Sequence, residues 1–519
     1  MKPRSPTFKD FPLDIVGSLS YGRYSKISVE NTYNMIISDN FLVDYAGWSV
    51  AIPNINPDGK GRGSYKSARL NRVFVCIGNG IYIITPSLSA TLIGQIATFT
   101  GNVFFAEDNQ NNLQICDELN IYNYNTLTNA FTTLTLDFKP GYIAFHDTRF
   151  LSVDLNTSQW RLSNPLAANQ TYPNTTQFVG AFQTKPDIPL VIFPLPGKGN
   201  NIIILGSIVG QYWTDIGAAL FPYQINAGVN IDYGIANSDT FATLDRYVAW
   251  LGINDRSGPV IMVSRGGEPE HISNDGIDFK LATLTNPQDS HGFMFKQDGH
   301  LLYQLTFPTD NLTLTFDFNT GRFFTITDAY MNYHPAKNVV FFNNTYYFVS
   351  LNDGSFYEMS TNDTTYGGQL IPRVRVCKTL RMPDTAPFIV NNLTFILEQG
   401  VVGSAYNAQE YGPYIISTED DNPLITEGGA YLTTEPNYVY GAGSIALQNP
   451  PLPAVDLSIS IDGGYTFSNF DRMQLNPIGL TRNRFIYYNL GWCNEFTPQF
   501  RFWSQARVVA GNGTMSTYQ

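Results

Sequence analysis

The sequence predicts an all-β protein, and three observations support that prediction. Aromatic residues make up 14% of the 519 residues, whereas charged residues make up only 14%. Short apolar runs bounded by Gly, Asn and Asp recur along the chain and indicate strand–turn–strand units. Between residues 200 and 273, where two such units follow each other, no segment has the helical period at a useful length. Many β-forming residues, many turns and little charge together favour sheets over helices.

The first part of the chain predicts an arm followed by a repeat region. Residues 1–50 contain short extended segments interrupted by Pro and Asn, which indicate a few strands and no core of their own. The connector IPNINPDGKGRG is rich in turn-forming residues. From Asn71 to about Thr361 the hairpin unit recurs at intervals of roughly 35–55 residues, a spacing typical of propeller blades, and the predicted propeller domain is 51–371. We therefore expect a β-propeller of about six or seven blades, with a β-solenoid or two packed sandwiches as alternatives.

The run PRVRVCKTLR marks the end of the repeat region. Its alternation places Arg373, Arg375 and Cys377 on one face of a strand and Val374 and Val376 on the other. A nucleic-acid patch would interleave aromatic residues and extend further. The pattern favours an ion-paired strand at a domain or subunit boundary.

The remaining segment, 372–519, predicts a β-sandwich platform that the arm of residues 1–50 joins. The runs AVDLSISIDGGYTFSNF, RFIYYNL and PQFRFWSQARVV alternate well enough to place one face of each strand on a core. Before these runs, residues 404–453 are rich in Tyr, Gly, Pro and acidic residues. This stretch predicts a long projecting loop with a solvated acidic tip.

The sharpest short motif lies in this platform and fits the Asp-box pattern S-x-D-x-G-x-T-W/F of sialidases and many other β-proteins. In such a turn the Asp side chain accepts hydrogen bonds from backbone amides, Gly supplies a positive φ, and the aromatic side chain packs beneath. The motif therefore predicts a hairpin-stabilising turn and no catalytic chemistry. Its residues are Ser460, Asp462, Gly464, Thr466 and Phe467.

The sequence predicts no catalytic, cofactor-binding or metal-binding residues. The five histidines include no pair at helical zinc spacing, since His291 and His300 are too far apart. There is no nucleophile elbow, P-loop or dinucleotide-binding fingerprint. Glu268 and Glu270 flank Pro269 and are expected to be exposed turn acids. A catalytic trio assembled from distant loops remains an alternative.

Charge and cysteine content restrict the class of protein. With 31 basic and 43 acidic residues, the formal charge of −12 argues against tight wrapping of nucleic acid, which needs clustered Lys and Arg. An acidic surface could serve solubility, or could line a conduit through which DNA slides. The widely separated Cys76, Cys116, Cys377 and Cys493 are expected to be buried free thiols made in a reducing compartment. We expect neither a signal peptide nor a membrane span.

Several segments, in order, resemble the packaged-DNA stabilisation (tail hub, or nozzle) proteins of short-tailed bacteriophages. The early VENTYNMIISDNFLVDYAGW is similar to that family's N-terminal segment. The stretch from LGSIVGQYWTD to RYVAWLGINDRSGPVIM is similar to its central hairpins. The runs NNLTFILEQGVVG, LSISIDGGYTFSNF and YYNLGWCNEFTPQFRFWS resemble its closing β-module. Together these segments span most of the chain.

The resemblance implies a structural protein of the virion tail, assembled in the bacterial host cytoplasm. It implies a homo-hexameric ring below the portal and its adaptor (head completion) protein, which extends the DNA channel and retains the packaged genome. Tail fibres or tailspikes and a terminal plug or needle would be further partners. Genomic double-stranded DNA would pass through a lumen richer in acidic than in basic residues, without sequence-specific binding. No enzymatic activity or cofactor is implied.

Two other functions remain as alternatives. The first is a glycan-active or glycan-binding tail protein on an Asp-box propeller, which would need an Arg cluster and a carboxylate pair at the propeller centre. The second is a receptor adhesin without enzymatic activity at the tail tip.

Overall fold

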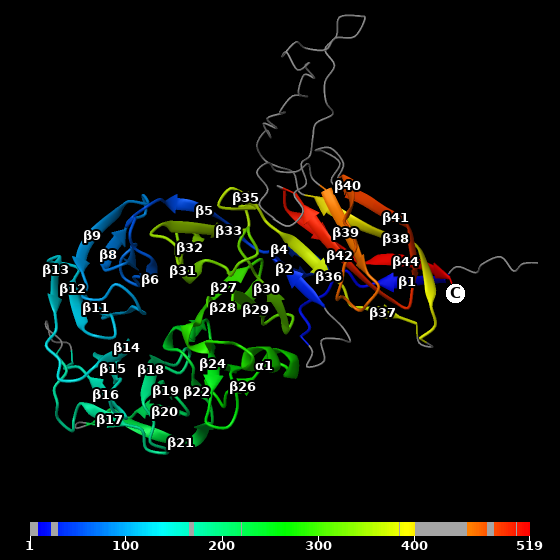
Figure 1. The fold of residues 1–519 in the computed structure, drawn as a ribbon. Helices are drawn as coiled ribbons and strands as arrows, with labels where there is room; N and C mark the ends of the chain where they lie inside the picture. The colour runs from blue at the N-terminus through cyan, green and yellow to red at the C-terminus, as the bar shows by residue number, and fades with distance from the viewer. Residues whose placement is uncertain are drawn as a thin grey trace, which may run out of the picture.

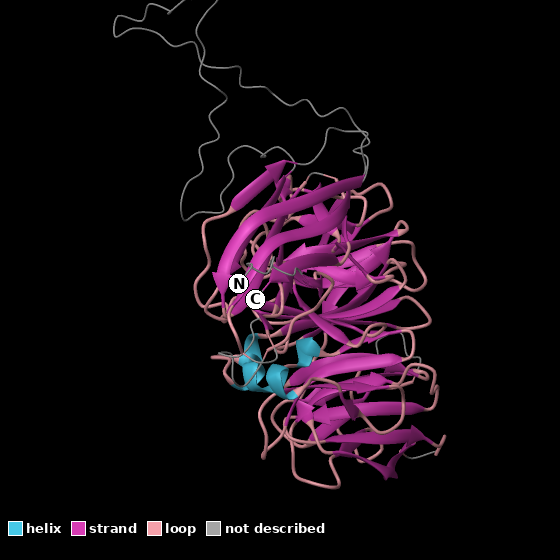
Figure 2. Cartoon of the chain, turned by 90° about the vertical axis from the view of Figure 1, so that its right-hand side faces the viewer, coloured by secondary structure: helices cyan, strands magenta, loops and turns pink. Residues whose placement is uncertain are grey.

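A computed structural model describes residues 9–21, 30–165, 171–218, 221–382, 385–399, 454–474, 482–504 and 506–518. It confirms the all-β prediction: in these ranges the helical elements are short, as Figures 1 and 2 show. None of them is long and apolar enough to cross a membrane. The predicted projecting loop 404–453 lies outside the described residues. The helical elements are α1 (Asp275–Ala282), η1 (Ser238–Thr240) and η2 (Pro287–Asp289).

The β-propeller is a ring of antiparallel sheets that follow each other in chain order (Figure 1). The first half of the ring consists of four-stranded sheets, each a meander of consecutive strands. In order, these sheets are β6 (Gly61–Lys66), β7 (Val73–Ile77), β8 (Gly80–Ile84) and β9 (Ala90–Gln95); β10 (Phe104–Glu107), β11 (Asn112–Cys116), β12 (Ile121–Asn125) and β13 (Ala130–Thr133); β14 (Pro140–His146), β15 (Arg149–Asp154), β16 (Gln159–Leu162) and β17 (Val179–Ala181); and β18 (Pro189–Pro194), β19 (Asn201–Gly206), β20 (Gly210–Asp215) and β21 (Tyr223–Ile231).

The second half of the ring is less regular. Within the described residues the ring has seven sheets. Six of them lie wholly within the propeller, whereas the sheet of β27–β30 continues into the platform. This arrangement agrees with the predicted six or seven blades. The sheets are β22 (Gly234–Ile235), β23 (Ala242–Leu244), β24 (Tyr247–Ile253), β25 (Val260–Ser264) and β26 (Glu270–His271); β27 (His291–Gln297), β28 (His300–Phe307), β29 (Leu312–Asp317) and β30 (Arg322–Thr325); and β31 (Ala336–Phe342), β32 (Thr345–Ser350) and β33 (Phe356–Ser360) with β5 (Gly47–Ile52), β34 (Thr365–Tyr366) and β35 (Gln369–Leu370).

Each blade is stable because it buries both faces against its neighbours. Successive side chains of a strand point to opposite faces. On β24, Val248 and Trp250 pack against the blade of β18–β21, whereas Ala249 and Leu251 pack against β27–β30. All four side chains are fully buried. The continuous apolar runs of the sequence are therefore strands buried on both sides.

Two sheets pack face to face to form the predicted sandwich platform. Phe395 in one sheet packs edge-on against Phe500 in the other, with ring centroids 5.0 Å apart. One sheet contains β1 (Lys9–Leu13), β3 (Met35–Ser38), β4 (Phe41–Asp44), β38 (Phe388–Gln399), β41 (Arg482–Cys493), β43 (Val508–Ala510) and β44 (Gly513–Tyr518); the other contains β2 (Asn31–Tyr33), β36 (Arg373–Val376), β37 (Leu380–Arg381), β39 (Ala454–Ser460), β40 (Asp471–Gln474) and β42 (Glu495–Trp503).

The N-terminal arm links the platform to the propeller. Its strands β1 and β4 pair with the platform strands β44 and β43, and β3 pairs with β4 at the edge of that sheet. The arm strand β2 lies between β30 of the propeller and β36 of the platform. The next strand, β5, pairs with β33 and completes the last blade. The predicted domain boundary near residue 371 falls in the connection between β35 and β36. The predicted boundary near residue 50 falls inside β5.

The predicted ion-paired strand is confirmed at the junction of the two domains. Arg373 on β36 donates two hydrogen bonds to Asp44, at 2.7 and 2.8 Å, and Arg375 donates one to Glu30 at 2.5 Å. Both arginine side chains are fully buried. These ion pairs tie β36 to the N-terminal arm. The free thiols are also as predicted, since all four cysteines are buried and unpaired.

The helix α1 was not predicted from the sequence. Asn274 caps it by accepting a hydrogen bond from the backbone N–H of Ile277 at 3.0 Å. The helix has only eight residues, too few to show an apolar period. Its cap was the available signal, because Asn before Asp275 is a favourable start for a helix.

Candidate functional site

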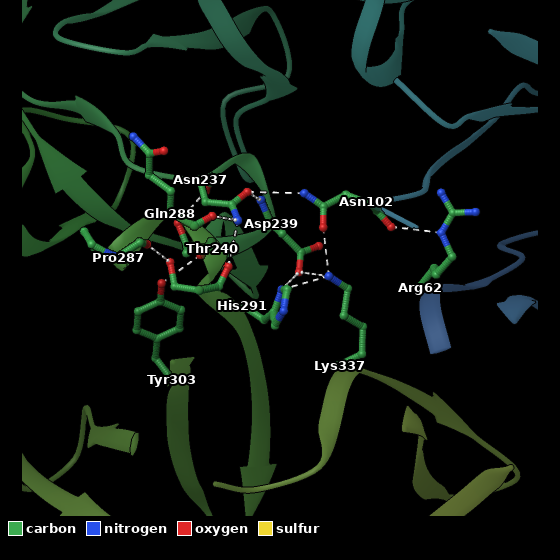
Figure 3. A network of polar contacts seen from close by, with 12 residues as sticks. Arg62, Asn102, Asn237, Asp239, Thr240, Pro287, Gln288, His291, Tyr303 and Lys337 are labelled. Atoms are coloured by element: carbon green, nitrogen blue, oxygen red, sulfur yellow. Dashed lines mark hydrogen bonds and ion pairs between the residues drawn. The ribbon is translucent and has the colours of Figure 1, made fainter. Parts of the chain in front are cut away.

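The starts of the innermost strands meet at one mouth of the propeller, where polar side chains from several blades form a network (Figure 3). Lys337 on β31 contacts Asp239 Oδ2 at 2.7 Å and donates to Asn102 Oδ1 at 2.8 Å. His291, the first residue of β27, places Nδ1 2.6 Å from the same Asp239 oxygen. The network therefore joins loops and strands of four blades.

The loop that carries Asp239 is held by a second set of hydrogen bonds. Asn237 accepts a hydrogen bond from the Asp239 N–H and donates to the carbonyls of Gln288 and Ser290, at 2.6 and 3.0 Å. The Tyr303 hydroxyl donates to the Thr240 carbonyl at 2.7 Å. These hydrogen bonds hold the loop so that the Asp239 carboxylate points toward the centre of the propeller.

The charges around Asp239 favour the ionised form of its carboxyl group. Burial raises the pKa of this carboxyl, but Lys337 and His291 outweigh burial and lower it. Burial lowers the pKa of Lys337, and Asp239 opposes that effect. Burial and the Lys337 charge lower the pKa of His291. His291 Nδ1 also lies 2.8 Å from the Lys337 Nζ. Because a lysine ammonium only donates, this nitrogen accepts from Lys337 in one tautomer and donates to Asp239 in the other.

Aromatic side chains of neighbouring inner strands form a second layer at the centre. Phe104 and Tyr142 have ring centroids 4.5 Å apart, and Tyr142 lies 5.9 Å from Phe241. Phe193 packs on Phe241 at 5.4 Å. These four side chains come from four adjacent blades. Their contacts bury apolar area that would otherwise line an open channel.

The two layers close the centre of the propeller. Asn102 precedes β10, and Asn237 precedes β23 on a distant blade, yet their side chains form a hydrogen bond of 3.3 Å across the centre. The Lys337 side chain is 3% exposed. A buried ammonium that already has three contacts is poorly placed to reach a substrate. The network is therefore better suited to holding blades together than to catalysis.

The predicted glycan-active alternative requires a free Arg cluster and a carboxylate pair at this centre. Glu118 does lie near Asp239, since burial and then the Asp239 charge raise its pKa. However, Arg62 donates to the carbonyls of Gly78, Thr98, Thr100 and Gly101, at 2.6–2.9 Å. Its guanidinium is committed to the backbone, and this geometry favours a structural role.

The other histidines lie outside the network. His146 bridges the Tyr223 hydroxyl and the Gly199 carbonyl, and His300 contacts Asp317. Across the described ranges, no group of three His, Cys, Asp or Glu side chains could hold a metal ion.

The predicted Asp-box turn lies in the platform, between β39 and β40. Asp462 accepts hydrogen bonds from the Tyr465 and Thr466 amides at 3.0 Å, and Ser460 donates to it at 2.6 Å. The hydrogen bonds from Ser460 and Thr466 lower the pKa of Asp462. Gly464 has φ 96°, a conformation that favours glycine, and Phe467 is half-buried. The stabilising role of this turn stays a prediction.

The central residues were not found from the sequence because they are far apart in it. Lys337 and Asn102 are separated by 235 positions. Their common feature is that each lies at or just before an innermost strand of the repeat. Superposing the repeats in register would have placed Asn102, His291 and Lys337 within a few positions of each other.

A family match covers most of the propeller. Residues 31–364 match the family model described as Phage_stabilise, Bacteriophage P22 Gp10, beta-propeller. No curated protein matches the sequence significantly.

Solved structures similar to this chain are distant. A streptogramin B lyase is 14% identical, with a TM-score of 0.42 over 61% of this chain and 98% of its own. A virginiamycin B lyase from Staphylococcus aureus is 12% identical, with a TM-score of 0.41 over 59% and 96%. The WD40 domain of Neurospora crassa Pan2 is 6% identical, with a TM-score of 0.39 over 64% and 99%. At such low scores these similarities carry no argument about function.

Proposed function

The chain belongs to the phage stabilisation family of bacteriophage P22 Gp10, and on that premise we propose that it is the hub, or nozzle, of a short phage tail. Membership makes it a tail-associated, DNA-stabilising propeller protein and a virion component. The hub itself is a homo-hexameric ring below the portal and its adaptor. The ring extends the DNA channel, holds the packaged genome and anchors fibres or tailspikes and a terminal plug.

The family match carries this proposal, and the closed propeller centre supports a DNA conduit that lies outside the centre of each propeller. Asn102 and Asn237 are hydrogen-bonded across that centre, and Lys337 is buried beside them. A duplex has no path through a ring whose opposite side chains touch. The conduit therefore lies between copies of the chain, and the formal charge of −12 supports a wall that repels DNA.

The position of the protein on the virion is the first test. Gold-labelled antibody should cluster at the single tail vertex, close to the capsid, in electron micrographs of intact particles. Label on distal fibres would instead favour an adhesin or a glycan-binding protein. Particles without any label would contradict a virion role.

The symmetry and the conduit are tested by electron cryomicroscopy of full and emptied particles. Six copies should surround one axis, with DNA density on that axis and protein density at each propeller centre. DNA density through a propeller centre would refute the closed-centre argument. As a separate check of the non-enzymatic role, the purified chain should release no sugar from a fluorogenic sialoside.

A further inference from the structure

The face opposite the polar network carries a cluster of basic side chains, which we call the basic cluster and define as Lys198, Arg246 and Arg265. The starts of the innermost strands meet at the network, so the turns that follow these strands lie at the other face. Lys198 lies in the turn between β18 and β19, and Arg246 in the turn between β23 and β24. Arg265 directly follows β25. All three side chains are exposed.

The cluster is tightly assembled from two neighbouring blades. The Lys198 side chain packs directly against Gly266. A Cβ added to this glycine would lie only 2.9 Å from Lys198 Cγ. A Cβ on Gly197 would similarly lie 3.6 Å from Arg246 Cγ. The three cations therefore come from turns that touch each other, although they are distant in sequence.

The turns beneath the cluster are anchored to the blades. His146 Nε2 lies 2.7 Å from the Gly199 carbonyl in the Lys198 turn. In the Arg265 turn, the Gly267 carbonyl accepts hydrogen bonds from Tyr212 at 2.9 Å and from Ser264 at 3.1 Å. These bonds reduce the conformational entropy that the cluster would lose on binding a ligand.

The cluster has cations without carboxylate partners. Across the described ranges, no ion pair joins any of its three members to an acidic side chain. The adjacent Asp245 is instead paired with Lys296. The Arg265 guanidinium lies over the Tyr247 ring, 4.8 Å from its centroid. Stacking of this kind holds a guanidinium in place while its N–H groups remain available.

We propose that the basic cluster binds backbone phosphates of double-stranded DNA. Unpaired, positioned Arg and Lys side chains are the groups that contact phosphate oxygens in proteins. An acidic wall lets DNA slide but offers no attraction, so a local cationic contact adds to the retention of the genome. The proposal rests on the tail-hub function for the identity of the polyanion.

DNA binding by the purified full-length chain tests the proposal. The probe is a short fluorescein-labelled DNA duplex, followed by fluorescence anisotropy at several salt concentrations. Three phosphate contacts predict a slope of log K against log salt of about −2.7, or about 40-fold weaker binding at 200 mM than at 50 mM salt. The triple variant K198A/R246A/R265A should lose this salt-dependent binding.

The matched control is K60A/R256A/K280A, which removes equal charge elsewhere in the propeller: before β6, between β24 and β25, and in α1. It should bind DNA with wild-type affinity and slope, and thermal melting should show that both variants fold. Equal loss in the two variants, or no DNA binding by the wild-type chain at low salt, would overturn the proposal. So would a triple variant that binds DNA normally but no longer self-associates in sedimentation, because the cluster would then contact an acidic surface of a second copy. These outcomes are independent of where antibody labels the virion.

Discussion

Replacing His334 with Gln should remove a large part of the acid sensitivity of folding. His334 is fully buried at the junction of the propeller and the platform. Its ring centroid lies 4.8 Å from that of Trp48 and 5.8 Å from that of Phe348. Nδ1 accepts a hydrogen bond from the Ala336 N–H at 3.3 Å, and Nε2 has no partner. The imidazole is therefore held neutral in an apolar site.

The magnitude follows from linkage between protonation and folding. Burial lowers the pKa of His334 from 6.5 to about 3. Below pH 6.5 the unfolded chain binds a proton that the folded chain does not. Stability is then lost as the pH falls from 6.5 toward 3, by about 1.4 kcal/mol per pH unit. At pH 5 this one residue should cost about 2 kcal/mol relative to neutral pH.

The assay is urea unfolding of the wild type and H334Q at pH 7 and pH 5. The variant is expected to be less stable at pH 7 by about 1–3 kcal/mol, since it loses aromatic packing. Its further loss on acidification should be smaller than that of the wild type by about 2 kcal/mol. The exposed His271 provides a comparison, H271Q, which should keep the acid loss that His334 causes in the wild type. Equal acid losses in H334Q and the wild type would refute the reasoning.

Three further predictions follow from buried or locally bonded groups. R373A should destabilise the chain by about 3–5 kcal/mol in urea unfolding, because it leaves Asp44 buried without its cation; a loss no larger than that of a surface Arg→Ala variant would contradict this. D462A should speed hydrogen exchange of the Thr466 amide while the melting temperature changes little, and unchanged exchange would mean that the turn does not depend on this carboxylate. Because burial raises the pKa of Cys76 to about 12, this thiol should react with an aromatic disulfide reagent only after unfolding, as mass spectrometry of the labelled peptide would show.

Much of the fold could be predicted because its signals are local. The hairpins β19–β20 and β24–β25 occur where short apolar runs flank turns, and the pairing is between neighbours in the chain. The alternation around β36 correctly placed its arginines in ion pairs. The partners, Asp44 and Glu30, could not be predicted, since each lies more than three hundred positions away.

The sequence by itself determined the all-β class, the repeated hairpins, the sandwich platform and the buried thiols. These features depend on periodicity and turn chemistry within short windows. The tertiary structure alone decided which side chains meet at the closed centre and in the basic cluster. A ring brings together residues that occupy equivalent places in different repeats, and nothing in the local pattern of one repeat specifies the polar residue it will meet. The closed centre and the basic cluster therefore arise from ring closure, when strands from separate repeats come side by side.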